Sequence, residues 1–349
     1  MKIDKLFIML IALAFNLSAY DFVVIKNPKP NIVEKEYKEL VKIQELTAEL
    51  QDDDFIFKPF SITGDGNGHI YIYDDVQAKV FKLDHQLKIL GSFGQTGSGP
   101  GDFFGNRMGV YLSFGLDGYL YARDMMAWKV MKFSRDFKFI RQYRYHRYGN
   151  FMQGGFSVDL DGNIYLYKIK DNMLTFRNQD EKMLMQIPVC EEDVGSLFWM
   201  KPKEFSEVGC IRLVFAHNPI LLVLFQDTST LLVIKENKVV KRMNLWPRDA
   251  LADYKSKLKR VVDRPMKGFT SLFYNFFIDG DDKNVFYLQY GKNETKGINA
   301  LYKFTLNGEL LKVLFIRSEK AHVRFLLNQG NKFFAISGEK LLVYMEEKK

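Results

Sequence analysis

The chain reads FSITGDGNGHIYIYDD from Phe60 to Asp75 and KVFKLDHQLKILGSF from Lys79 to Phe93. The same order of residue types returns as VYLSFGLDGYLYARD from Val110 to Asp124 and as KVMKFSRDFKFIRQY from Lys129 to Tyr143. Each copy contains an apolar strand, a turn rich in Asp, Asn and Gly, a strand of alternating aromatic and aliphatic residues, and a further apolar strand that carries Lys. Self-similarity at a regular spacing indicates a repeat architecture, so these stretches predict repeated β-sheets.

The pattern occurs six times in the chain. One apolar residue in the second strand of each segment marks the repeat. These anchors lie 44 to 64 residues apart, and they are Ile70, Leu120, Ile164, Leu221, Val285 and Phe333. Blades of β-propellers are four-stranded sheets with a repeat of about this length. The expected fold class is therefore all-β, a six-bladed β-propeller of four-stranded antiparallel blades.

The sixth segment has only three strands before the sequence ends. A strand from the N-terminal part can complete this last blade, and the alternating stretch ELVKIQEL from Glu39 to Leu46 is the candidate. The propeller is therefore expected to occupy residues 39–349. One short helix is expected in the connection between the fourth and fifth blades, over Pro247–Asp263, because apolar residues recur there with helical spacing.

The N-terminus has the order of a secretory signal peptide. Two lysines precede an apolar run of ten residues, Leu6–Phe15, and small residues follow it. The run is too short to span a bilayer, which requires about 20 residues. We expect residues 1–19 to be a signal peptide and 20–38 an N-terminal extension, with no transmembrane segment in the mature chain; an uncleaved anchor or a buried strand is the alternative. The mature protein would be periplasmic or extracellular.

Only two cysteines occur, Cys190 and Cys210. In an oxidising compartment an isolated pair of this kind forms a single disulfide in some proteins. Two buried free thiols are equally compatible with the sequence, so both alternatives stay open.

The linker between the first two segments carries a further signature. It reads SFGQTGSGPGDF from Ser92 to Phe103, in which an outer strand runs through a Gly-rich linker into the next blade. With the repeated Asp-Gly-Asn turns, the chain from about Leu40 to Met345 resembles exported bacterial six-bladed β-propeller proteins of the NHL-repeat type. The resemblance implies a propeller with a binding face. It implies no single activity, because members range from interaction platforms to lyases and lactonases.

Ligands of such propellers meet the face formed by the loops between second and third strands and by the links between blades. The net charge of +8 favours anionic partners, whereas export argues against nucleic acid. The stretch RQYRYHRY from Arg141 to Tyr148 interleaves basic and aromatic residues, which suits a protein, a glycan or another anionic ligand. A solvated outer strand is the alternative. The predicted ligand-binding residues are Arg107, Trp128, Arg144, His146, Arg147 and Tyr148.

Two acids occupy matching positions at the ends of second strands, Asp74 and Asp124. Acids at a repeated position commonly bond backbone amides of their own turn, which is the structural interpretation. Together with His322 they are also the candidate ligands of calcium or zinc in a lactonase-like hydrolase or lyase. The sequence contains no evident nucleophile and base pair, so it favours a non-enzymatic binding or scaffold protein without a required cofactor.

Overall fold

The structure is a computed structural model of the chain. It describes residues 23–26, 37–46, 55–104, 109–144, 156–170, 173–188, 211–217, 220–225, 230–245, 275–278, 285–289, 298–317, 323–329 and 331–346.

Every regular element among these residues is a β-strand, and the strands form five sheets. Three sheets have four strands each in chain order: β3 (Pro59–Gly64), β4 (Ile70–Asp74), β5 (Lys79–Leu83) and β6 (Ile89–Phe93); β7 (Val110–Phe114), β8 (Leu120–Asp124), β9 (Lys129–Phe133) and β10 (Phe139–Arg144); β11 (Ser157–Val158), β12 (Ile164–Lys170), β13 (Met173–Arg177) and β14 (Met183–Pro188). A five-stranded sheet has the order β1 (Val23–Lys26), β18 (Lys238–Asn244), β17 (Thr230–Lys235), β16 (Ile220–Phe225) and β15 (Ile211–His217). An eight-stranded sheet has the order β19 (Asn275–Ile278), β20 (Val285–Gln289), β21 (Ile298–Thr305), β22 (Leu310–Arg317), β2 (Tyr37–Leu46), β25 (Lys340–Glu346), β24 (Lys332–Ser337) and β23 (Arg324–Gln329).

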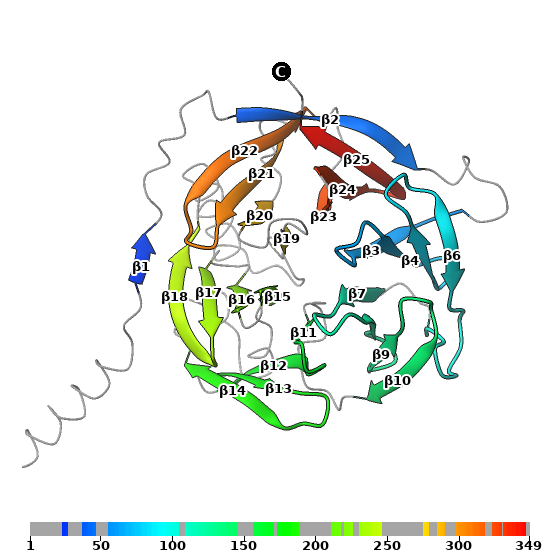
Figure 1. The fold of residues 1–349 in the computed structure, drawn as a ribbon, viewed down its shortest axis with the longest axis horizontal. Coiled ribbons are helices and arrows are strands. Elements are labelled where there is room, and N and C mark those ends of the chain that lie inside the picture. Colours follow the sequence, from blue (N-terminus) through cyan, green and yellow to red (C-terminus); the bar gives the residue numbers. More distant parts are fainter. Residues whose placement is uncertain are drawn as a thin grey trace, which may run out of the picture.

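The sheets stand in chain order around a ring (Figure 1). Strands β3, β7, β11, β15, β19 and β23 lie on its inside and contact one another in turn, and β23 contacts β3 so that the ring closes. From each inner strand the chain moves outward through antiparallel pairs. This is a β-propeller-like arrangement, which confirms the expected all-β class.

Two N-terminal strands cover outer edges of this ring. Strand β2 pairs antiparallel with β25, from Leu40 opposite Glu346 to Leu46 opposite Leu341. The strand expected to complete the last segment, 39–46, is therefore the one that does so. The start of β2 also pairs in parallel with β22, and β1 adds in parallel to the outer edge of β18.

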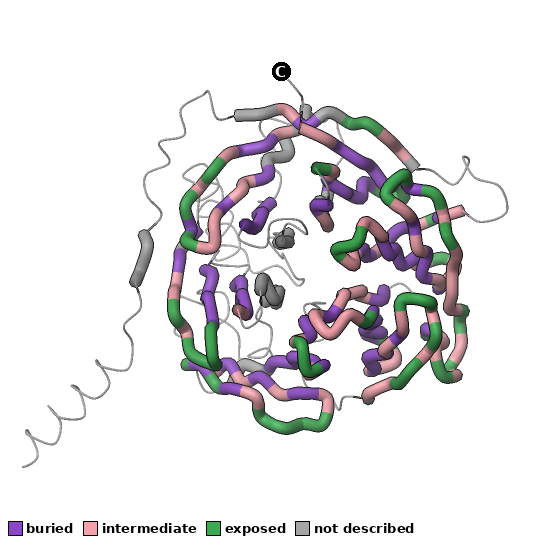
Figure 2. The backbone as a smooth tube through the Cα atoms, in the orientation of Figure 1, coloured by how far each residue is buried: buried purple, intermediate pink, exposed green. Residues whose placement is uncertain are grey.

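The core lies between neighbouring sheets. The second strands β4, β8 and β20 are buried along their whole length, and all six anchor residues of the repeat are buried. Six apolar clusters of the described residues lie around the ring. Five of them join two successive sheets, and the sixth joins the two halves of the eight-stranded sheet, β20–β22 on one side and β2, β24 and β25 on the other. Figure 2 shows the same division, with buried residues in the second strands and exposed residues along the outer strands and hairpins. Burial on both faces explains why these second strands read as nearly continuous apolar runs.

Four outer hairpins share one five-residue turn: Asp84–Lys88, Ser134–Lys138, Asn178–Lys182 and Thr305–Glu309. In each turn the side-chain oxygen of the first residue accepts the backbone N–H groups of the third and fifth residues. The fourth residue has a positive φ, which is 69° at Leu87, 67° at Phe137, 60° at Glu181 and 82° at Gly308. Only the last copy has the glycine that this backbone conformation favours.

Several predicted features lie outside the described residues. These are the signal peptide over 1–19, the helix over 247–263, and both cysteines. Within the described part of the chain, no helix is long and apolar enough to cross a membrane.

Candidate functional site

Two equivalent turns follow the second strands of the first two sheets. Asp74 ends β4 and Asp124 ends β8, and both carboxylates are buried. Oδ1 of Asp74 accepts the N–H groups of Val76 and Gln77 at 2.9 and 2.8 Å, and Oδ1 of Asp124 accepts the N–H of Ala127 at 2.9 Å. Each turn ends with a residue at φ 52°, the fourth after the acid. The two turns therefore have the same local structure.

The second oxygen of each acid binds the segment that leads into the same sheet. Oδ2 of Asp74 accepts the N–H groups of Phe57 and Lys58, and Oδ2 of Asp124 accepts the N–H of Phe104 at 2.7 Å. Each carboxylate thus fixes two loops to one another. This confirms the structural interpretation of the two recurring acids.

The described residues contain no group of three or more His, Cys, Asp and Glu side chains that could hold a metal ion. The third predicted ligand, His322, lies outside the described residues. The metal site of Asp74, Asp124 and His322 therefore stays a prediction, and the hydrogen bonds to backbone amides give the two acids a structural role.

The loops fixed by these acids present apolar side chains to solvent. The exposed fraction is 37% for Phe57, 61% for Val76, 47% for Phe104 and 38% for Met126. We call these four residues the apolar rim. Phe57 and Val76 flank the Asp74 turn, and Phe104 and Met126 flank the Asp124 turn. The two neighbouring sheets therefore each carry an exposed apolar pair at equivalent positions. Because the carboxylates fix the backbone, these side chains are held in place before any ligand arrives.

The Gly-rich linker positions Phe104. Its chain folds back on itself, with Phe103 N–H bonded to Gln95 O at 2.8 Å and Gly97 N–H bonded to Phe103 O at 2.9 Å. The Phe103 ring is fully buried and lies edge-on to Tyr73 at 5.2 Å between ring centroids. A Cβ at Gly94 would lie 2.4 Å from that ring, so this glycine is required. With Phe103 anchored inside, the next residue is directed outward.

Two of the six predicted ligand-binding residues, Trp128 and Arg144, are described, and the structure places both at this end of the sheets. Arg144, the last residue of β10, is exposed and pairs in register with Lys129, which directly follows Trp128. Trp128 is half-buried and packs with Tyr143 against the apolar cluster between the second and third sheets. The other four predicted ligand-binding residues lie outside the described residues: Arg107, His146, Arg147 and Tyr148.

Lys129 itself is buried, and its Nζ donates to the backbone oxygen of Asp102 at 2.6 Å. Burial lowers the pKa of Lys129, while the nearby Asp124 and Asp102 oppose this effect. Lys129 therefore serves to fix the linker, and Arg144 is the cation that solvent reaches.

The apolar rim was not predicted from the sequence. A signal for it existed, because Val76 and Met126 stand at the tips of turns where polar residues are usual. Neither residue is basic or aromatic, so neither belongs to the pattern that predicted the ligand-binding residues.

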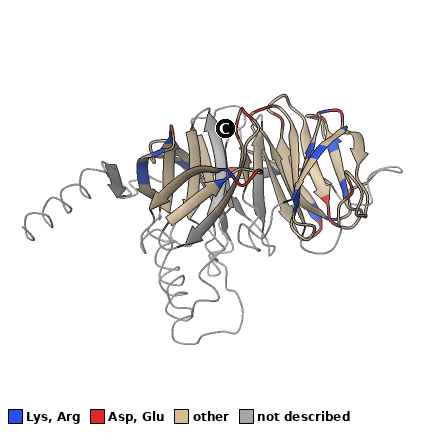
Figure 3. Ribbon diagram, turned by 90° about the horizontal axis from the view of Figure 1, so that it is seen from below, with Lys and Arg blue, Asp and Glu red and all other residues tan. Residues whose placement is uncertain are grey.

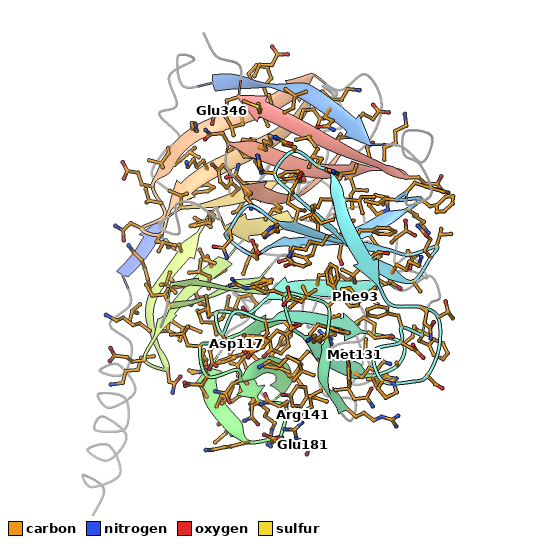
Figure 4. All side chains as sticks on the ribbon, turned by 45° about the vertical axis from the view of Figure 1, so that its right-hand side comes forward. Phe93, Asp117, Met131, Arg141, Glu181 and Glu346 are labelled. Atoms are coloured by element: carbon orange, nitrogen blue, oxygen red, sulfur yellow. The ribbon has the colours of Figure 1, made fainter. Side chains whose placement is uncertain are left out.

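The opposite end of the second sheet holds a closed polar network. Oδ2 of Asp117, labelled in Figure 4, accepts the Tyr121 hydroxyl at 2.7 Å and Lys132 Nζ at 2.8 Å. Burial, followed by the bond to Asp117, raises the pKa of Tyr121 well above its usual value. The Asp117 and Lys132 side chains are 8% and 17% exposed. Since these groups are paired with one another, the network links structural elements and leaves the other end as the candidate site.

No protein-family model matches the chain. No curated protein matches its sequence. A presumed exported protein of Bacteroides fragilis is 12% identical and has a TM-score of 0.56, with 93% of this chain and 100% of that chain covered. A member of the DUF4221 family from Bacteroides vulgatus is 14% identical with a TM-score of 0.50, covering 90% of this chain and 99% of that chain.

A catalytically inactive virginiamycin B lyase from Staphylococcus aureus is 12% identical with a TM-score of 0.48, covering 86% of this chain and 98% of that chain. At these identities the likeness shows the fold alone, and the first two structures agree with the β-propeller-like arrangement. The resemblance to NHL-repeat proteins stays a prediction from the linker motif.

Proposed function

We propose that this chain is an exported six-bladed β-propeller that binds an anionic partner and performs no catalysis. The six inner strands, which contact one another in turn around the ring, and the six apolar clusters around it support a count of six blades. The signal-peptide pattern of residues 1–19 supports export, as does the likeness to a presumed exported protein.

The observation that carries the binding function is the geometry of the two turns. Buried carboxylates fix paired loops, and the fixed loops expose apolar side chains at the end of the sheets where Arg144 and Trp128 also lie. Single exposed apolar side chains are common on protein surfaces, whereas a grouped set commonly marks an interaction site. Figure 3 shows both signs of charge spread over the described sheets, so the local surroundings of this end matter more than the total charge.

Labelled poly-glutamate is a suitable first probe, with binding measured by fluorescence anisotropy at increasing salt. We expect salt-sensitive binding. We also expect the double variant Lys79→Ala/Arg144→Ala, which removes Arg144 and the lysine opposite Asp74 in register, to bind about ten-fold more weakly, since each charge pair contributes up to about 1 kcal/mol. The control is Lys88→Ala/Lys138→Ala, which removes two exposed lysines from outer hairpins at the other end of the same sheets. Equal loss in both variants would contradict the assignment of the site.

A further inference from the structure

The described acids at the candidate site all have hydrogen-bond or ion-pair partners. Asp74 and Asp124 accept backbone amides, Asp75 pairs with Lys58 at 3.1 Å, and Asp102 accepts the N–H of Gly99 at 2.9 Å. No acid among the described residues of the two turns is exposed, so none presents its carboxylate directly to an anion in solvent.

Two cations at this end have no ion pair among the described residues. Lys79 starts β5 directly opposite Asp74 in register, and Arg144 ends β10. Lys79 is half-buried and Arg144 is exposed. The charged side chains that have no ion pair at this end of the described structure are therefore cations, and they lie at the same end as the apolar rim, which suits a partner that is both acidic and apolar.

The repetition of the surface limits the kind of partner. The pair Phe57 and Val76 on the first sheet matches the pair Phe104 and Met126 on the second. The two sheets are neighbours, since Ser61 Oγ in β3 donates to Val110 O in β7 at 2.6 Å. A partner that uses both pairs must itself extend across two sheets. Val76 and Met126 are aliphatic and offer no polar atoms, so they favour apolar side chains over sugar hydroxyls.

We propose that the apolar rim is the docking surface for an extended acidic polypeptide that carries aromatic residues. The partner's carboxylates lie near Lys79 and Arg144, and its rings pack on the apolar rim. This inference rests on the proposed function, because it names the class of anionic partner that the same face binds.

A random copolymer of Glu and Tyr tests the proposal against poly-glutamate of equal length. We expect the copolymer to bind about ten-fold more tightly, since aromatic contacts add about 0.5–1.5 kcal/mol each beyond the area they bury. The variant Val76→Ser/Met126→Ser, which removes apolar surface without adding charge, should remove this advantage. The control Leu90→Ser/Ile140→Ser changes two exposed apolar residues on outer strands of the same sheets and should retain it. Circular dichroism checks that each variant is folded.

The outcomes separate the two hypotheses. Both polymers could bind equally well and both lose binding in Lys79→Ala/Arg144→Ala. That result would overturn the proposal that the partner carries aromatic residues, and it would leave the proposed anion-binding site in place. Binding of neither polymer would contradict the proposed function as well. Sedimentation with phosphatidylglycerol vesicles that requires Val76 and Met126, without a preference for the copolymer, would identify the surface as a membrane contact and overturn the inference.

Discussion

Replacement of Asp74 by Ala removes the carboxylate that holds the first turn. Asp74 is fully buried and, within the described structure, accepts four backbone N–H groups, whereas Asp124 accepts two. Four partly buried donors then lose their acceptor, and each net hydrogen bond contributes about 1 kcal/mol, so we expect Asp74→Ala to lower the free energy of unfolding by about 4 kcal/mol. On the same reasoning Asp124→Ala lowers it by about 2 kcal/mol.

The neighbouring acid supplies a matched control. The Asp75 side chain is only 3% exposed, but one of its oxygens pairs with Lys58, whose side chain is 41% exposed, and the other has no hydrogen-bond partner within the described structure. Asp75→Ala should therefore change the free energy of unfolding by about 1 kcal/mol or less. Urea denaturation followed by far-UV circular dichroism gives the three values, with midpoints compared at a common m-value. Two results would refute the reasoning. One is a free energy of unfolding for Asp74→Ala that is no lower than that of Asp75→Ala, and the other is a larger loss of stability in Asp124→Ala than in Asp74→Ala.

Three further results are expected. Glu181→Gly should raise the thermal midpoint and Gly308→Ala should lower it, because both positions have positive φ, which costs an L-residue about 1–2 kcal/mol; no change in either would contradict the shared turn. Gln329→Met should stabilise the protein by about 1 kcal/mol in urea denaturation, because both polar atoms of the buried Gln329 amide lack a hydrogen-bond partner within the described structure. A loss of stability would instead indicate a bound water that the substitution displaces. Glu45 bonds Lys340 of β25, and that bond and a second one to Lys42 lower its pKa below the usual 4.5. The stabilisation of the fold by ionised Glu45 is therefore present above pH 4.5 and is lost as the pH falls through the lowered pKa. Glu45→Gln should reduce the fall in thermal midpoint below pH 4.5, and an unchanged fall would argue against the pair of Glu45 and Lys340.

The repeat was predictable because burial leaves a strong signal. Ile70 and Leu120 start second strands that are covered on both faces, so their sequences are apolar and recur at each sheet. The closing strand was predictable for a related reason. The final segment lacks a fourth strand, and the alternating residues 39–46 match the edge that they complete.

The candidate site was predictable only in part. The matching positions of Asp74 and Asp124 predicted a shared role for the two acids, either structural or metal-binding, and their bonds to backbone amides bear out the structural interpretation. The loops that they fix did not show, because Phe57 and Phe104 are brought to the acids by hydrogen bonds between residues 17 and 20 positions apart. Exposure of Val76 and Met126 also depends on packing around the whole turn. Periodicity reports burial along a strand and carries little information about such loops.

Hydroxyl-radical footprinting with the bound copolymer of Glu and Tyr tests the central claim most directly. Met126 in the apolar rim is 38% exposed, and Met183 on the outer strand β14 is 54% exposed, so the free protein supplies a reporter and a control of the same residue type. The account predicts that the copolymer lowers the oxidation of Met126 and Phe104 and leaves Met183 unchanged. Protection of Met183 with unchanged oxidation of Met126 would place the binding surface elsewhere and contradict the account.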